Sequence, residues 1–364
     1  MKCTNNVTVP MVLRTCCAKC GKRMDYRRGP FRHRRFRMRG MLGGVLISSM
    51  LISGMLMAGC GNKAYEMAYS PNYPVSSYRM DAVEERGDTA VPFAKELCVA
   101  DGDVSAGTDV DMSQAGAAAL FSVNESGTIY AKNAHERMAP ASLTKVMTAL
   151  VALKYGSPDD LLTASANVKI TEPGATLCGL KEGDQMTLTQ ALHILLIQSS
   201  NDVAVLIAEG ISGSEEAFCS LMNQEAKALG ATNCNFVNPH GLTAENHYVT
   251  AYDMYLIFNE ALKYNLFSEI ISTPSYTTVY KDSAGNDKEL SVNSSNLYLH
   301  GEKEAPDTIT VVGGKTGTTK AAKSCLILLS RSSSGGQYIS VILGSETRDT
   351  LYDEMTDLLD EIKN

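Results

Sequence analysis

Ser142 and Lys145 form the only Ser-x-x-Lys sequence in the chain, within the segment PASLTKVMTAL at residues 140–150. A serine hydroxyl is a weak nucleophile at neutral pH and needs a base within hydrogen-bonding reach. If Ser142 begins a helix after Pro140, Lys145 lies on the same helix face, and the Ser142 N–H stays free to bind an oxyanion. The pair could therefore be a nucleophile and its base. Alone, the pattern is more typical of an ordinary helix start with a solvated lysine.

A second polar segment, Ser199-Ser200-Asn201, separates two apolar stretches, LHILLIQ and VAVLIAE. The Ser-x-Asn spacing carries little information by itself, because it also occurs elsewhere in the chain. Its position carries more, because buried polar groups are costly without partners. A polar break between two buried helices therefore favours a functional use of these side chains. The alternative is that Ser200 or Asn201 simply caps a helix.

The third segment is the chain's only Lys-Thr-Gly, Lys315-Thr316-Gly317, within the strand-like stretch TVVGGKTGTTK. Glycines in a strand allow an extended substrate to lie close along the backbone. The alternative is a polar edge strand whose lysine deters aggregation.

The periodicity of the chain predicts the elements that must position these three segments. A glycine turn at residues 124–127 joins two short strand-like runs. Helical patterns then dominate, strands return late, and a helix ends the chain. This order predicts an α/β (α+β) fold in which one antiparallel sheet of about five strands is covered by helices on both faces. The predicted helices are 142–155, 188–197, 201–210, 214–229, 250–263 and 347–362, and the late strands are 275–281, 287–292, 308–318, 324–331 and 337–344.

Charge is distributed very unevenly along the 364 residues, of which 44% are apolar and sufficient for a substantial core. Residues 1–40 carry 12 basic residues and one acidic residue, whereas residues 61–364 carry 21 basic and 39 acidic residues. Such an acidic body argues against nucleic acid as a partner. The five cysteines after Cys60 are widely spaced and odd in number, so no disulfide framework is predicted.

In this order, the three motifs resemble those of the penicillin-recognising serine acyl-enzymes. The stretches PASLTKVMT, SSND, FVNPHGL and KTGTT are most similar to the low-molecular-mass D-alanyl-D-alanine carboxypeptidases of the serine peptidase S11 type. The resemblance covers about residues 115–364. It implies a β-lactamase/DD-peptidase-like fold and removal of the terminal D-alanine from peptidoglycan stem peptides. It also implies covalent inhibition by β-lactam antibiotics and no cofactor or metal.

Three catalytic roles follow from the resemblance. Ser142 would be acylated, Lys145 would take its proton as general base, and Ser199 would relay a proton to the leaving D-alanine. For Lys145 to act as a base, its pKa must fall from about 10.4 toward neutrality. Burial and a second cation nearby, Lys315, would shift the pKa in that direction.

The resemblance also implies the residues that bind the substrate. Asn201 would hold Lys145 and the substrate amide, and Lys315 and Thr316 would face the terminal carboxylate. The backbone N–H groups of Ser142 and Thr318 would form the oxyanion hole. The full predicted substrate-binding set is Asn201, Lys315, Thr316, Gly317, Thr318 and Arg348, in which Arg348 is a candidate for a further carboxylate contact.

Two rival interpretations stay open. A class A-like β-lactamase shares the motifs but uses a glutamate, with an asparagine three residues later, to activate the deacylating water. No glutamate between Glu209 and Glu269 has an asparagine at that spacing, so we expect penicillin to be an inhibitor and not a substrate. The other rival is a non-catalytic cell-wall-binding lipoprotein, against which the intact motif residues argue.

The basic leader is followed by an apolar run of about 17 residues that ends in Met57-Ala58-Gly59-Cys60. The run is short for a membrane span and typical of a secretory signal, and its end resembles a bacterial lipobox, which implies a lipid on the Cys60 sulfur. A signal-anchor helix with an incidental cysteine is the alternative. We predict a leader and lipoprotein signal peptide (1–59), a lipid-anchored flexible tether (60–114) and a DD-peptidase catalytic domain (115–364) on the outer face of the cytoplasmic membrane.

Overall fold

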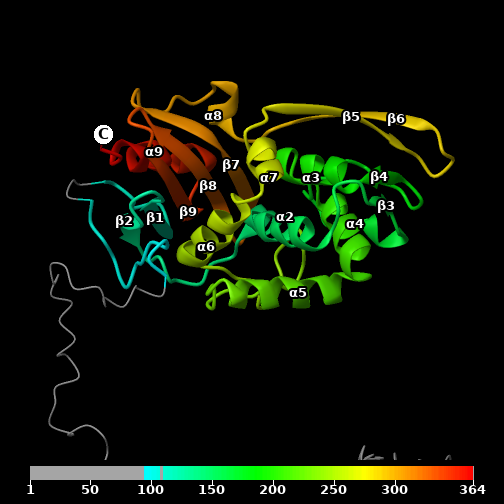
Figure 1. Ribbon diagram of the computed structural model, residues 1–364, viewed down its shortest axis with the longest axis horizontal. Coiled ribbons are helices and arrows are strands. Elements are labelled where there is room, and N and C mark those ends of the chain that lie inside the picture. Colours follow the sequence, from blue (N-terminus) through cyan, green and yellow to red (C-terminus); the bar gives the residue numbers. More distant parts are fainter. Residues whose placement is uncertain (1–93, 107–109, 364) are drawn as a thin grey trace, which may run out of the picture. The chain divides into compact units, whose positions relative to one another are not determined.

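A computed structural model describes residues 94–106 and 110–363 (Figure 1). The predicted signal peptide, the predicted lipid site at Cys60 and the first part of the predicted tether lie outside these residues. Within the described ranges, no helix combines the length and the hydrophobicity that crossing a bilayer requires.

The main sheet has five antiparallel strands in the order β2-β1-β9-β8-β7, so β2 and β7 are its edges. Strand β1 is apolar at nearly every position because both of its faces are buried. Its alternate residues Ala119 and Phe121 contribute to one core, and Ala118 and Leu120 contribute to the other. The strands are β1 (Ala117–Ser122), β2 (Gly127–Lys132), β7 (Ile309–Thr319), β8 (Lys323–Ser332) and β9 (Gln337–Ser345).

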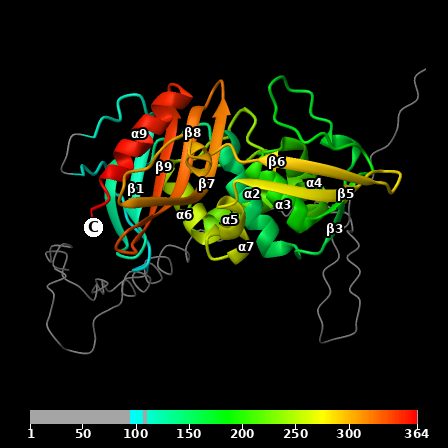
Figure 2. The same cartoon turned by 90° about the horizontal axis from the view of Figure 1, so that it is seen from above.

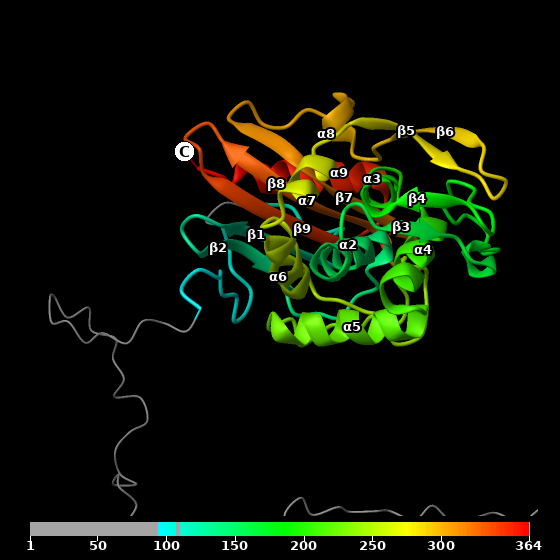
Figure 3. The same cartoon turned by 45° about the vertical axis from the view of Figure 1, so that its right-hand side comes forward.

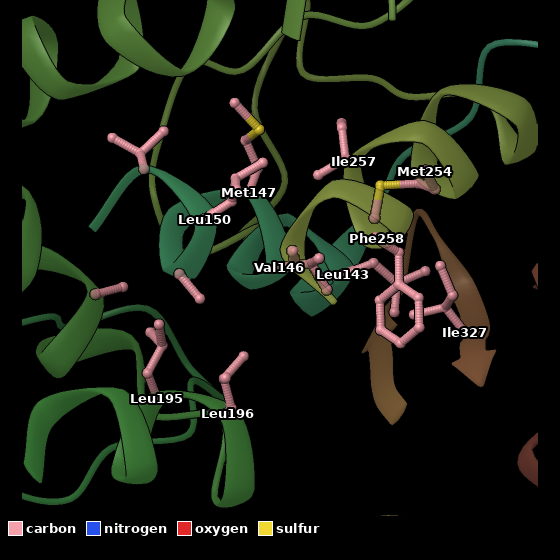
Figure 4. Close-up of a cluster of buried hydrophobic side chains, with 14 of the residues drawn as sticks. Leu143, Val146, Met147, Leu150, Leu195, Leu196, Met254, Ile257, Phe258 and Ile327 are labelled. Carbon is pink, nitrogen blue, oxygen red and sulfur yellow. The ribbon is translucent and has the colours of Figure 1, made fainter. Parts of the chain in front are cut away.

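Helices cover both faces of this sheet, which confirms the predicted fold class. Figure 2 shows α9 (Arg348–Asp360) on one side and α2 (Thr144–Tyr155) and α6 (Ala251–Ala261) on the other. In the larger core, Val146 of α2, Phe258 of α6 and Ile327 of β8 belong to one cluster of buried side chains (Figure 4). Helix α9 buries Met355 and Leu359 against the opposite face. Helix α6 packs against both α2 and the strands β1 and β9, so it joins α2 to the sheet.

Further helices extend this layer beyond the sheet edge formed by β7. Thr187 and Gln190 form a capping box that begins α3, and a left-handed Gly213 ends α4. Helix α5 lies against α2 and α4, on the side away from β5 and β6 (Figure 3). The remaining elements are η2 (Ala141–Leu143), η3 (Ala166–Val168), α3 (Leu188–Ile197), α4 (Asn201–Ser212), α5 (Glu215–Ala228), α7 (Asn265–Ile271) and α8 (Leu297–His300).

The expectation of one sheet was wrong, because four strands form a second sheet in the order β3-β4-β5-β6. Strands β5 and β6 each bury little of their surface. They pair with each other, and β5 pairs with β4 instead of the main sheet. The Asp184 carboxylate accepts a hydrogen bond from the Ser283 N–H at 3.2 Å, which fixes the hairpin turn beside β4. The strands are β3 (Leu161–Thr163), β4 (Gln185–Thr187), β5 (Ser275–Lys281) and β6 (Asp287–Asn293).

Residues 94–106 pack against the body, although the sequence predicted a flexible tether as far as residue 114. Cys98 is fully buried. Its N–H donates to the Tyr255 hydroxyl at 2.9 Å, and its carbonyl accepts from the Tyr252 hydroxyl at 2.9 Å. Val104 and Ala131 exchange two backbone hydrogen bonds. The packed region therefore begins earlier than the predicted boundary at residue 115.

Candidate active site

Ser142 lies in the short helix η2, directly before α2, so Lys145 follows one turn later on the same face. The preceding Ala141 has a left-handed φ of 46°, a strained conformation that is common next to functional side chains. Lys145 Nζ lies 3.0 Å from Ser142 Oγ. The Lys145 side chain is completely buried, which is exceptional for a lysine and excludes the solvated alternative.

Two further acceptors hold the Lys145 amine. Asn201 Oδ1 and the His240 carbonyl oxygen each lie 2.6 Å from Nζ. The His240 loop is fixed by a 3.1 Å bond from the Leu242 N–H to His240 Nδ1. Gly241 has φ 87°, and a Cβ there would lie 1.9 Å from the Ala141 carbonyl oxygen, so only glycine fits. The loop therefore presents a carbonyl to Lys145 at close range.

The environment strongly disfavours a charge on Lys145. Burial holds its pKa well below the ordinary lysine range, the positive charge of Lys315 lowers the pKa further, and Asp202 opposes this shift. Burial also lowers the pKa of Lys315 to about 7. The direction agrees with the one that general-base catalysis requires. Burial and the Lys145 charge lower the pKa of His240 to about 3, so its ring is neutral.

Ser199 lies in the break between α3 and α4, and Asn201 is the first residue of α4. Ser199 has a left-handed φ of 71°, and its buried hydroxyl has no hydrogen-bond partner among the described residues. The Asn201 N–H donates to the Thr176 carbonyl at 2.8 Å. Asp202 accepts from the backbone N–H groups of residues 178–180 at 2.8–3.2 Å. These bonds hold the loop that contains Thr176 beside the break.

Strand β7 brings Lys315, Thr316 and Gly317 to the same place. Lys315 is 1% exposed, and its Nζ donates to the Thr316 carbonyl at 2.8 Å. A Cβ at Gly317 would lie 2.9 Å from the Ser142 backbone nitrogen. The edge strand therefore passes directly over η2. Thr316 and Thr318 are two residues apart on it, so their backbone groups point to the same side.

A cavity of about 200 Å³ joins most of the predicted residues. Lys145, Asn201 and Lys315 are buried, and the two lysines contact the lining residues Ser142 and Thr316. Arg348, at the start of α9, also lines the cavity. The residues that line this cavity are Ser142, Thr176, Gln198, Ser199, Ser295, Thr316, Gly317, Thr318, Cys325, Arg348, Leu351 and Tyr352. A larger cavity of about 500 Å³, next to residues 94–97, contains none of the predicted site residues.

The sequence did not point to three contributors. The His240 carbonyl holds Lys145, and the Ser295 carbonyl accepts from Arg348 Nη2 at 3.1 Å. Because every residue has a carbonyl group, no residue type signals such a role. Thr176 lies in a loop without periodicity. Only its position just before Cys178, whose N–H binds the buried Asp202, could have indicated that it belongs to the site.

At the β7 edge of a sheet with helices on both faces, the partly buried Ser142 lies beside the fully buried Lys145, an arrangement with the chemistry needed for serine acyl transfer. Residues 105–347 match the peptidase S11 family, described as D-alanyl-D-alanine carboxypeptidase. The chain belongs to this family.

Individual relatives agree with this assignment. The chain is 37% identical over 256 residues to D-alanyl-D-alanine carboxypeptidase DacF of Bacillus subtilis, which covers 68% of the chain and 61% of DacF. It is 34% identical over 244 residues to DacC of Escherichia coli, which covers 64% of the chain and 58% of DacC. The chain thus spans about three fifths of the length of these curated relatives.

A solved structure is similar over the same region. A variant of the Streptomyces K15 DD-transpeptidase superposes with a TM-score of 0.63 and 25% identity, covering 68% of this chain and 97% of that chain.

Proposed function

We propose that the protein is a serine-type D-Ala-D-Ala carboxypeptidase that removes the terminal D-alanine from peptidoglycan stem peptides. The observation that carries the proposal is the set of contacts at Lys145 Nζ. A neutral amine has two protons and one lone pair. Asn201 Oδ1 and the His240 carbonyl can only accept, so they take both protons. The lone pair must then face the Ser142 hydroxyl, 3.0 Å away.

This arrangement supports acylation through a tetrahedral intermediate. Ser142 Oγ attacks the carbonyl carbon of the penultimate D-alanine as its proton passes to Lys145 Nζ. The carbonyl oxygen becomes an oxyanion, which the backbone N–H groups of Ser142 and Thr318 stabilise. The amide bond then breaks, and the leaving D-alanine nitrogen receives the proton from Lys145 through the Ser199 hydroxyl. An ester on Ser142 remains, and water hydrolyses it to release the shortened peptide.

The terminal carboxylate of the substrate lies where the structure gathers donors. Thr316 and Arg348 both line the cavity. Lys315 is buried directly behind Thr316 and adds positive potential. A substrate with a free carboxylate at the end of an extended peptide fits this polarity.

Penicillin would acylate Ser142 by the same chemistry, since its lactam carbonyl and carboxylate mimic the peptide end. The described residues that line the cavity include no aspartate or glutamate that could activate a deacylating water. We therefore favour slow release of penicillin over the class A β-lactamase alternative. The buried Lys145, whose pKa burial holds well below the ordinary lysine range, also disfavours a non-catalytic binding role, since binding alone does not need a base.

The location of the protein is part of the proposal. The apolar run and the Cys60 context support export, a lipid on Cys60 and residence at the outer face of the cytoplasmic membrane. Globomycin treatment of cells expressing the chain should block its signal cleavage, and a Cys60→Ser variant should lose labelling by a palmitate analogue. Unchanged processing and labelling would contradict the anchor.

One assay tests the proposed activity. We expect release of D-alanine from a diacyl-D-Ala-D-Ala peptide by the wild-type protein and loss of this activity in Lys145→Ala. Fluorescent penicillin should label the wild type and not Ser142→Ala. Rapid turnover of nitrocefin would instead favour the β-lactamase, and an unlabelled wild type would favour the binding protein.

A further inference from the structure

Ser295 lies at the point where the carboxylate-binding side of the cavity is assembled. It follows β6 and lines the cavity together with Ser142. Its hydroxyl is hydrogen-bonded to Thr316 Oγ1. Its carbonyl accepts from Arg348 Nη2 at 3.1 Å and from the Tyr352 hydroxyl at 3.4 Å. One residue therefore contacts both side chains that we propose to bind the substrate carboxylate.

The backbone around Ser295 is fixed by its neighbours. The Ser294 N–H donates to the Pro274 carbonyl at 2.8 Å, and the Asn296 N–H donates to Ser294 Oγ at 3.2 Å. Asn296 itself is 1% exposed. Ser295 is therefore held in place before a substrate arrives, which is the condition for orienting other groups efficiently.

We infer that Ser295 is a positioning residue that selects substrates with a free terminal carboxylate, an inference that rests on the proposed function. A hydroxyl has one proton to donate. When Ser295 donates its proton to Thr316 Oγ1, the Thr316 proton is directed at the carboxylate, and the two bonds strengthen each other.

The Ser295 carbonyl acts on Arg348 in parallel. It binds one N–H of the guanidinium group, which has five N–H donors, so further donors remain for the carboxylate. The carbonyl thus fixes the orientation of the guanidinium group while using only one of its donors. Ser295 thus aims a neutral donor and a charged donor at the same anion.

The selectivity gives a test that separates positioning from general support of the fold. Acylation rates of the full chain are measured with benzylpenicillin and with its methyl ester, which lacks the negative charge. In Ser295→Ala we expect benzylpenicillin to react about fivefold more slowly, equivalent to one ordinary hydrogen bond, and the ester to react at the wild-type rate. Ser295→Thr should restore the benzylpenicillin rate. The neighbouring Ser294→Ala, whose hydroxyl faces Asn296, should not change the ratio of the two rates.

A double variant shows whether Ser295 acts through Thr316. In a Thr316→Val background, Ser295→Ala should slow benzylpenicillin no further. Equal slowing of both compounds in Ser295→Ala, or a full additional effect in the Thr316→Val background, would overturn the inference. If neither compound acylates the wild-type protein, the proposed function fails, and the inference fails with it.

Discussion

Replacing Gly317 with alanine should slow acylation of Ser142 about tenfold while leaving the protein folded. An alanine Cβ at this position would lie 2.9 Å from the Ser142 nitrogen, 3.1 Å from Ala141 Cβ and 3.2 Å from the Leu143 nitrogen. Unbonded heavy atoms prefer about 3.5 Å or more. Strand β7 and η2 must therefore separate by about 0.5 Å, which moves the two N–H groups of the proposed oxyanion hole apart. A 1 Å misplacement can cost about a hundredfold in rate, so a displacement of about 0.5 Å predicts about a tenfold loss in the acylation rate.

The assay is the second-order rate of labelling by fluorescent penicillin, measured beside thermal unfolding. Gly127→Ala is a matched control, because Gly127 also lies in a strand and a Cβ there meets no atom within 4 Å. We expect the control to react at the wild-type rate. A Gly317→Ala protein that is as stable and as reactive as the wild type would refute the idea that β7 sets the oxyanion hole.

Three further changes test the electrostatics and the support of the site. Lys315→Met removes a positive charge that lowers the Lys145 pKa, so that pKa should rise. The acid limb of the pH–rate profile for acylation should then move to higher pH. An unmoved limb would contradict the coupling between the two lysines. Asn201→Asp keeps the shape but places a carboxylate beside Lys145 Nζ, which should keep the amine protonated and lower the rate at pH 7 about a hundredfold, with recovery at alkaline pH as the check. Asp202→Ala removes the acceptor of four backbone N–H groups, those of residues 178–180 and Val203, and should cost about 3 kcal/mol of unfolding free energy in urea, whereas a loss under 1 kcal/mol would show that water replaces the carboxylate.

Much of the fold could be predicted from the sequence, because its long elements have clear periodicity. The hairpin around residues 124–127, the helix after Ser142 and the strands after residue 308 are all present close to their predicted bounds. The second sheet was missed, since β3 and β4 have three residues each and such runs show no period. The packing of residues 94–106 was also missed, because it depends on hydrogen bonds to the backbone of Cys98 and not on a run of apolar side chains.

The candidate site, like the fold, could be predicted only in part. Side chains with distinctive chemistry, such as Ser142, Lys145 and Lys315, were found from the sequence, and the structure brings them together. Contributions from the backbone, such as the carbonyls of His240 and Ser295, have no counterpart in residue type. They become visible only when the loops that carry them are placed.

The central claim is that Lys145 is uncharged at neutral pH, with its lone pair directed at Ser142. The most direct measurement is an NMR titration of the protein labelled with ¹³C at the lysine ε-carbons, in which a Lys145→Arg variant identifies the signal. We predict that this signal titrates well below the ordinary lysine range. If it titrates near 10.4, as a solvated lysine does, in a folded protein, the mechanism proposed for Ser142 is wrong.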